Sequence, residues 1–299
     1  MLTLDERKVR KGKPVGLPYQ GSKKKISKKI VEIIKQNFGT DKPIYDIFGG
    51  GGAITAECLI NGLEVYYNDL DRTITDMFQR VLVTDREFLK TLIISRDEFL
   101  KIRDKENKTV DDNLKLLVNS FGNNKETYLY SEEFSDLKHN LVTEIIKKHD
   151  TFSGYRKTET YLKKKNTFKE QLEQLQQLRR LQSLGRLQSL EQLQQLRRLQ
   201  QVETTNLDYT EFSGVENAIL YLDPPYENAT LRGYSIDSFS SQSFYDWAYE
   251  MSKKNIVLIS SYEISDNRFE CVYEFKTVKS TLAPNKRSGN KTEKLFMVK

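Results

Sequence analysis

Short apolar runs, separated by polar turns that contain glycine or proline, occupy the first and last parts of the 299-residue chain. Each run is short and bounded by turn residues, so we expect strands at 43–47, 63–68, 202–206, 218–222 and 256–261, with helical stretches between them. Two more strand candidates, 269–275 and 294–298, predict a terminal hairpin on the sheet edge. This alternation predicts an α/β fold with a largely parallel sheet.

Residues 84–201 interrupt the alternation, because they are rich in helix formers and polar residues. A connection between two parallel strands is normally short, so we expect this stretch to be an inserted, mainly helical domain. The expected organisation is a sheet domain built from residues 1–83 and 202–299, with residues 84–201 forming the second domain.

A repeat rich in leucine and glutamine covers residues 172–201, with leucine at every third position from 172 to 199. The decapeptide 173–182 recurs at 191–200, and this offset of 18 residues equals five helical turns. The leucines therefore circle the helix axis, and no single face is apolar along the whole repeat. We expect two helices of about a dozen residues, broken near Gly185 and partly packed on the insertion. The alternative is a peripheral, partly disordered repeat.

The tetrapeptide 223–226, Asp-Pro-Pro-Tyr, follows the apolar run 218–222 and is therefore placed at the carboxyl end of a strand. Open α/β sheets bind ligands at that edge. The Asp223 carboxylate and the Pro224 carbonyl are acceptors, and Tyr226 adds a flat ring. This set suits the amino group of a planar base, which offers two N–H donors and a face for stacking. The alternative is an ordinary turn that ends a strand.

A glycine-rich turn follows the first expected strand and contains Phe48, Gly50 and Gly52. Its glycines let the backbone turn tightly and approach a ligand, but it lacks both the G-x-G-x-x-G fingerprint and the Lys-Ser/Thr of a phosphate-binding loop. The second strand ends at Asp69, which suits hydrogen bonding to both ribose hydroxyls of a nucleoside. The alternative role for Asp69 is the N-cap of the next helix.

Composition narrows the possible functions. The formal net charge is +6, and residues 1–30 hold ten Lys or Arg and two Asp or Glu, which suits phosphate contact on DNA. For residues 7–13 the alternative is a solvated, disordered tail. Two cysteines and two histidines argue against a disulfide framework, a zinc site and a Ser-His-Asp hydrolase, and the histidines are expected on the surface. No apolar run approaches 18 residues and no secretory signal is apparent, so we expect a cytoplasmic protein.

Taken together, these motifs resemble the DNA adenine-N6 methyltransferases of the Dam-like, class alpha group. Roughly the first 80 and last 100 residues are covered, and the motifs stand in the same order as in that family. The matching segments are Pro18-Tyr19-Gln20-Gly21-Ser22-Lys23, Asp46-x-Phe48-x-Gly50-x-Gly52, Asn68-Asp69, Asn206-Leu207-Asp208-Tyr209 and Asp223-Pro224-Pro225-Tyr226.

The resemblance implies a Rossmann-like sheet, S-adenosylmethionine as methyl donor and a target-recognition role for the insertion. It implies that Tyr19 and Lys23 line the cofactor site, although some relatives have tryptophan where this chain has Tyr19. The remaining cofactor roles follow from matched positions. Phe48, Gly50 and Gly52 would surround the methionine end, Asp69 would hold the ribose, and Asp208 would lie near the cofactor adenine.

The expected reaction is direct methyl transfer to the 6-amino group of an adenine flipped out of double-stranded DNA. Asp223 and the Pro224 carbonyl would accept the two N–H bonds, and Tyr226 would stack on the ring. Cytosine-N4, RNA or protein glutamine as acceptor, and a catalytically inactive DNA-binding homologue, are the alternatives. A cognate restriction endonuclease acting separately is an optional partner.

DNA contacts are expected from two segments that combine cations with turn residues. One lies in the insertion and the other precedes the last strand. They contribute Tyr155, Arg156, Lys157, Lys286 and Arg287.

Overall fold

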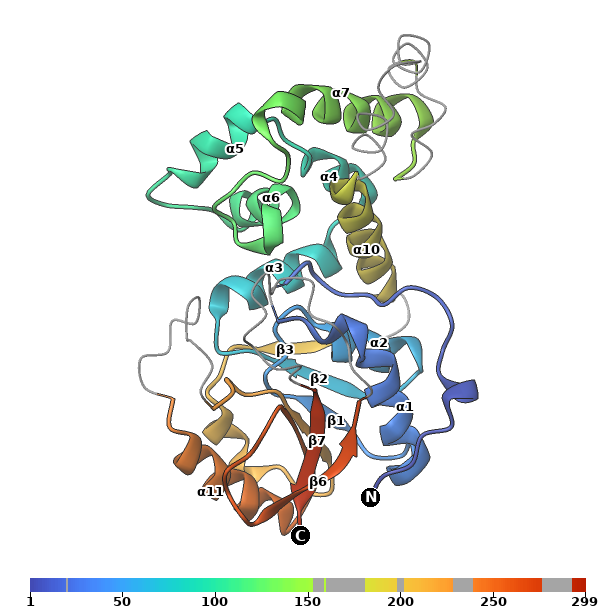
Figure 1. Ribbon diagram of the computed structural model, residues 1–299, viewed down its shortest axis with the longest axis vertical. Helices are drawn as coiled ribbons and strands as arrows, with labels where there is room; N and C mark the ends of the chain where they lie inside the picture. The colour runs from blue at the N-terminus through green and yellow to red at the C-terminus, as the bar shows by residue number, and fades with distance from the viewer. Residues whose placement is uncertain (20, 153–158, 160–180, 198–201, 228–238, 276–291) are drawn as a thin grey trace. The chain divides into compact units, whose positions relative to one another are not determined.

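The structure is a computed structural model that describes residues 1–19, 21–152, 159, 181–197, 202–227, 239–275 and 292–299 (Figure 1). The chain forms two compact units. The first consists of Met1–Pro14, Lys23–Thr75 and Arg198–Lys299, and the second of Val15–Ser22 and Asp76–Arg197.

The described part of the first unit contains a seven-stranded sheet with the order β3-β2-β1-β4-β5-β7-β6. Strands β1 to β5 are parallel, whereas β7 is antiparallel to both β5 and β6. The strands expected from the apolar runs are confirmed, as is the terminal hairpin at the sheet edge. Their bounds are Ile44–Asp46 (β1), Val65–Asn68 (β2), Glu203–Thr205 (β3), Ile219–Leu222 (β4), Ile256–Ser261 (β5), Phe269–Glu274 (β6) and Lys294–Val298 (β7).

The order of the parallel strands creates a reversal point between β1 and β4. The chain runs from β1 outward to β2 and β3, then returns to the other side of β1 with β4. A ligand crevice in an open α/β sheet forms outside the carboxyl ends of the strands at such a point. Asp46 ends β1, Asp69 follows β2 and Asp223 follows β4, so the strand order brings these three carboxylates to one edge of the sheet.

Helices cover both faces of this sheet. Helices α1 (Ser27–Phe38) and α2 (Ala53–Ile60) lie on one side, and α11 (Ser241–Ser252) lies on the other (Figure 1). The short helices η1 (Glu6–Lys8), η2 (Lys23–Lys25) and η5 (Tyr209–Gly214) complete the unit. The core beneath α11 contains fully buried Leu220, Leu222 and Ile259 together with Phe244, so aliphatic strand residues pack against an aromatic helix face.

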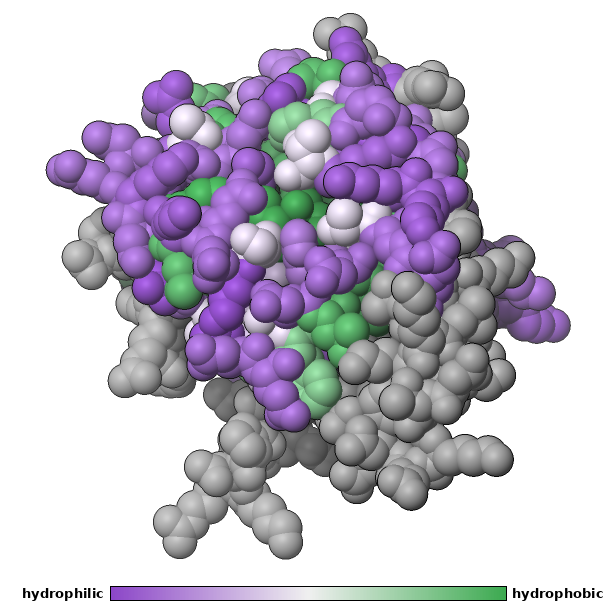
Figure 2. Space-filling model, turned by 90° about the horizontal axis from the view of Figure 1, so that it is seen from above, coloured by the Kyte–Doolittle hydropathy of each residue, from purple (hydrophilic) through white to green (hydrophobic). Residues whose placement is uncertain are grey.

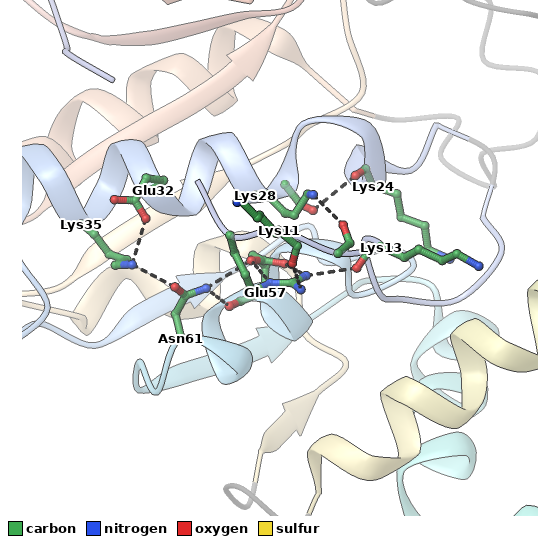
Figure 3. A network of polar contacts seen from close by, with 11 residues as sticks. Lys11, Lys13, Lys24, Lys28, Glu32, Lys35, Glu57 and Asn61 are labelled. Atoms are coloured by element: carbon green, nitrogen blue, oxygen red, sulfur yellow. Dashed lines mark hydrogen bonds and ion pairs between the residues drawn. The ribbon is translucent and has the colours of Figure 1, made fainter. Parts of the chain in front are cut away.

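The basic N-terminal segment is attached to the sheet unit by specific contacts. The Arg10 guanidinium donates two 2.7 Å hydrogen bonds to the carboxylate of Glu57 in α2, and Glu57 is only 1% exposed. Asn61 also donates to Glu57, and Lys28 donates to the Gly12 carbonyl (Figure 3). The disordered-tail alternative for residues 7–13 is therefore wrong, because a buried carboxylate requires this partner.

The regular secondary structure in the described part of the second unit consists of helices and an isolated bridge between Ser120 and Tyr128. Helix α6 begins with a capping box at Thr109, and aromatic side chains such as Phe99 and Tyr128 pack in the core. The face in Figure 2 is mainly hydrophilic, with small hydrophobic patches between polar side chains. The helices are α4 (Arg86–Thr91), α5 (Arg96–Arg103), α6 (Val110–Asn119), η3 (Phe121–Asn123), α7 (Glu132–His149) and α10 (Gln182–Leu196), and the unit boundary falls within α3 (Arg72–Val83).

The described part of the leucine repeat is the single helix α10, which continues through Gly185. The expected break at Gly185 is therefore wrong. All five leucines at 184, 187, 190, 193 and 196 are buried, although they spread around the axis. Burial on several sides explains the uninterrupted helix, because it outweighs the roughly 1 kcal/mol cost of one glycine in a helix interior. It also contradicts a peripheral position for this part of the repeat.

Candidate active site

The glycine-rich turn between β1 and α2 is shaped by a neighbouring tyrosine. A Cβ atom on Gly49 would lie 2.4 Å from the Tyr67 ring, so only glycine fits there. The Tyr67 hydroxyl donates to the Gly50 carbonyl at 2.8 Å. Gly50 and Gly52 have positive φ angles of 48° and 67°, which glycine adopts without a Cβ penalty. The turn is thus held in shape by Tyr67, and its buried glycines bring backbone without side chains to the sheet edge.

Asp69 holds the start of this turn through its side chain. Its Oδ2 accepts the Gly50 N–H at 2.7 Å, and its Oδ1 accepts the Asp71 N–H at 2.9 Å. Helix α3 is instead capped by Asp71, whose Oδ1 accepts the Thr73 N–H at 2.8 Å. The alternative role of Asp69 as the helix cap is therefore wrong, because Asp71 caps the helix. Both Asp69 oxygens retain acceptor capacity for a ligand.

The pKa values of the three carboxylates at the sheet edge are raised mainly by burial. Burial raises the pKa of Asp46 to about 7 and that of Asp69 to about 6, and the charge of Asp223 adds to both increases. The Thr55 backbone N–H and hydroxyl donate to Asp46 at 3.1 and 2.6 Å, which opposes the rise. The excess of negative charge at this edge favours a cationic ligand.

Asp223 forms an amine-binding cluster with Lys23 and Tyr226. Lys23 Nζ lies 2.8 Å from Asp223 Oδ1 and donates to the Tyr226 hydroxyl at 2.6 Å. The Tyr226 hydroxyl lies 3.1 Å from Asp223 Oδ1. Burial raises the pKa of Asp223 to about 6; the Lys23 ammonium opposes this rise, and the Glu293 charge adds to it. An acceptor at the end of β4 is therefore already bonded to an N–H donor.

Two groups of aromatic side chains lie at this edge. The Tyr262 ring meets the Tyr226 ring edge-on, with centroids 4.8 Å apart. Phe48 packs against Tyr209 and Phe244 at 6.0 and 5.7 Å between centroids, so it belongs partly to the core beneath α11. Tyr226 is thus fixed at its hydroxyl and at one aromatic contact, which restricts the orientation of its ring.

Glu293 was not identified from the sequence, yet it belongs to this cluster. Its Oε1 accepts hydrogen bonds from Tyr226 and, at 2.9 Å, from Ser260, and it lies 3.5 Å from Lys23 Nζ. Residue 293 immediately precedes β7, and Lys294 of β7 pairs with Ser261 at the carboxyl end of β5. The antiparallel direction of the last strand was the available signal, because it returns the chain to the ligand edge.

The remaining residues predicted from the sequence lie in different parts of the chain, and some lie outside the described residues. Asp208 caps η5, because its Oδ1 accepts from the Thr210 N–H and hydroxyl at 3.0 and 2.6 Å. Pro224 is buried directly after Asp223. Tyr19 belongs to the second unit, whereas the other cofactor candidates lie in the first. The DNA-contact candidates lie outside the described residues: Tyr155, Arg156, Lys157, Lys286 and Arg287.

Neither a metal site nor a membrane-spanning helix is found among the described residues. Within these residues, no group of three or more His, Cys, Asp or Glu side chains is arranged to hold a metal ion. None of the described helices combines the length and apolar character that crossing a membrane requires.

The model of the family described as D12 class N6 adenine-specific DNA methyltransferase matches residues 19–281, which is most of the chain. No curated protein matches the chain. The family match spans the glycine-rich turn, the insertion and the Asp-Pro-Pro-Tyr motif, so it includes parts of both units.

Proposed function

This chain belongs to the D12 class N6 adenine-specific DNA methyltransferase family, and from that premise we propose that it takes its methyl group from S-adenosylmethionine and binds the target amino group at Asp223. The enzyme class and the acceptor base follow from the family, so adenine is preferred to cytosine. The cofactor, the flipped state of the base, the Dam-like class and the residue roles are the proposed part.

The chemistry of the sheet edge supports a cationic cofactor. S-adenosylmethionine carries a sulfonium and an ammonium group, and the edge holds Asp46, Asp69 and Asp223, whose pKa values are raised by burial and by neighbouring negative charge. Positive charge placed there would relieve the repulsion. The glycine-rich turn lies beside these carboxylates, because the Gly50 N–H donates to Asp69 Oδ2. The residues present therefore fit this cofactor.

We assign the cofactor contacts by position in the motifs. Asp69 would accept hydrogen bonds from the ribose hydroxyls, because its two oxygens lie at the carboxyl end of β2. When bound, the cofactor supplies a methyl group already activated by the sulfonium. The other residues proposed to surround it are Tyr19, Lys23, Phe48, Gly50, Gly52 and Asp208.

The observation that carries the proposed acceptor site is the hydrogen bonding of Asp223. Its Oδ1 already binds the ammonium of Lys23 at 2.8 Å, so it is placed to accept an N–H from an adenine amino group. An ionised Asp223 and the Pro224 carbonyl would orient the nitrogen lone pair and stabilise positive charge that develops on nitrogen. Tyr226 would contact the flipped ring, and no covalent enzyme intermediate is required.

Double-stranded DNA is the proposed partner that presents the adenine. The base must leave the helix stack, because its amino group is otherwise paired. We propose contacts from Tyr155, Arg156 and Lys157 in the insertion, and from Lys286 and Arg287 before β7. A cytoplasmic location and a cognate restriction endonuclease that acts separately remain part of the proposal.

Identification of the modified nucleoside tests this function. Purified protein is incubated with double-stranded DNA and methyl-labelled S-adenosylmethionine, and the DNA is digested and analysed by mass spectrometry. We expect label in N6-methyladenine alone. Label in N4-methylcytosine would overturn the acceptor base. Absence of label from DNA despite cofactor binding would overturn DNA methylation, in favour of an RNA or protein acceptor or an inactive homologue.

A further inference from the structure

We propose that Glu293 is a positioning residue for the target amino group. When adenine binds to Asp223, Glu293 can accept the hydrogen bonds that Lys23 and Tyr226 otherwise make to Asp223. This inference rests on the proposed function of Asp223. It adds a carboxylate that lies 70 positions beyond Asp223 in the sequence and outside the Asp-Pro-Pro-Tyr motif.

The cluster contains one ammonium group and two carboxylates. Lys23 Nζ lies 2.8 Å from Asp223 Oδ1 and 3.5 Å from Glu293 Oε1, so its close partner is Asp223. The side chains of all three residues are at most 18% exposed. An ammonium group at such a depth needs a carboxylate partner, and Glu293 offers the second one.

The hydroxyl of Tyr226 connects the same two carboxylates. It lies within hydrogen-bond reach of Asp223 Oδ1, at 3.1 Å, and of Glu293 Oε1. A phenol has one proton and can donate it to only one of them at a time. Donation to Glu293 leaves the Asp223 oxygen available, so Tyr226 and Lys23 can both turn toward Glu293 together.

Glu293 is itself held firmly enough to receive these groups. Ser260, fully buried in β5, donates to Glu293 Oε1 at 2.9 Å. The Phe275 N–H donates to the Glu293 carbonyl at 2.9 Å, which fixes the backbone just before β7. The carboxylate is therefore anchored from β5 and from the strand pair β6–β7.

Binding of adenine creates the need for this exchange. In the proposed acceptor geometry the exocyclic N–H approaches Asp223 Oδ1, the oxygen that Lys23 now contacts. If Lys23 moves to Glu293, the ammonium stays paired and the Asp223 oxygen becomes free for the substrate. Without the Glu293 charge, displacement of Lys23 would leave a poorly paired buried cation, and target binding would weaken.

The electrostatics of the site give a second consequence. The Glu293 charge raises the pKa of Asp223, whereas Lys23 lowers it. The other titratable groups that interact with Asp223 are Tyr226 and Tyr221 from its own segment, Tyr262 after β5, Asp46 of β1 and Asp69 after β2. Loss of the Glu293 charge alone should therefore lower the pKa of Asp223. Protonation of Asp223 would then stop the reaction only at a lower pH.

Steady-state kinetics of Glu293→Gln with adenine-containing DNA test the inference. We expect the KM for DNA to rise about tenfold or more, because a hydrogen bond to a charged group is weakened, while kcat changes much less. The acid limb of kcat/KM should move to lower pH. Glu293→Asp retains the charge at a greater distance, so it should raise KM but keep the acid limb of the wild type.

Glu263→Gln is the matched control, because Glu263 is 78% exposed and pairs with Lys294, next to Glu293. It should match the wild type in KM and pH profile. The inference is overturned if Glu293→Gln matches this control, or if it lowers kcat with KM and acid limb unchanged. Circular dichroism checks folding. If Glu293→Gln does not fold, an unchanged KM in folded Glu293→Asp overturns the inference. A wild type that methylates no adenine refutes the proposed function instead.

Discussion

Two buried clusters of charge in the first unit differ in how completely they are paired. At the N-terminal segment, Arg10 meets Glu57 through two 2.7 Å hydrogen bonds, so one cation satisfies one carboxylate. At the end of β4, Lys23 serves both Asp223 and Glu293, and Asp46 and Asp69 add further negative charge. The complete pair holds a segment in place, whereas the incomplete one leaves acceptors for a ligand.

The contrast explains why the two clusters should respond differently to mutation. Removal of a partner from the complete pair leaves a buried charge unsatisfied and destabilises the fold. Removal of a carboxylate from the incomplete cluster relieves repulsion in the free protein, so stability should change little or rise while ligand binding suffers. Functional sites often lower the stability of the fold, so a mutation that removes such a site can raise stability while it abolishes function.

Asp223→Ala should have the largest effect on function. The single-turnover methylation rate should fall about 100- to 1,000-fold, because an acceptor aimed at developing charge is lost. Cofactor affinity should remain near that of the wild type, since Asp223 acts on the target amine. Rapid-quench assays and calorimetry measure the two quantities. A near-normal rate in folded protein would remove Asp223 from the mechanism.

Arg10→Ala should have the largest effect on stability. The free energy of unfolding should fall by about 3 kcal/mol, the lower end of the range for a broken buried pair, because Arg10 itself is 26% exposed. Chemical denaturation measures the change, and the methylation rate per folded molecule should not change. The control is Arg7→Ala, whose partner Asp5 lies on the surface and whose loss should cost little. Equal stability of both variants would contradict the comparison.

Asp69→Asn should weaken S-adenosylmethionine binding about tenfold or more, because hydrogen bonds to an ionised acceptor are lost. Affinity for DNA should change less. Asp71→Asn is the control, since Asp71 caps α3 and has no proposed contact with the cofactor. If calorimetry finds the same cofactor affinity in both variants, Asp69 serves only to hold the turn at Gly50.

Local sequence patterns were enough to predict the sheet and to place most of the candidate site residues at one edge of it. Asp69 and Asp223 could be identified because each follows a short apolar strand, and parallel strands share one carboxyl edge. Glu293 could not be identified in this way. The expected hairpin gives β7 its antiparallel direction, but the insertion of β7 between β5 and β6 is a long-range pairing that no local pattern specifies.

Two further differences between the sequence-based expectations and the structure also arise from long-range packing. The local propensity of Gly185 indicates a break, but burial of the surrounding leucines keeps α10 continuous. The charge run at residues 7–13 indicates a solvated tail, but Glu57 in α2 provides a buried partner for Arg10. Propensity and charge describe a segment by itself, whereas both outcomes depend on residues elsewhere in the chain.

The pH dependence of cofactor binding most directly tests the claim that the incompletely paired carboxylates at the end of β4 bind a cation. The free protein has the pKa of Asp46 at about 7 and those of Asp69 and Asp223 at about 6, all above 3.8, so these groups stabilise the fold below about pH 4 and lose that contribution as pH rises through 6 to 7. A bound cation favours their ionised forms and therefore releases protons.

Calorimetry from pH 5.5 to 7.0, in buffers of different ionisation enthalpy, measures the affinity and the protons released together. The account predicts that affinity for S-adenosylmethionine increases several-fold with pH, that protons are released on binding, and that Asp69→Asn reduces the release. An affinity that does not change with pH, with no proton released by the wild type, would contradict the claim that buried carboxylates in excess bind a cationic cofactor.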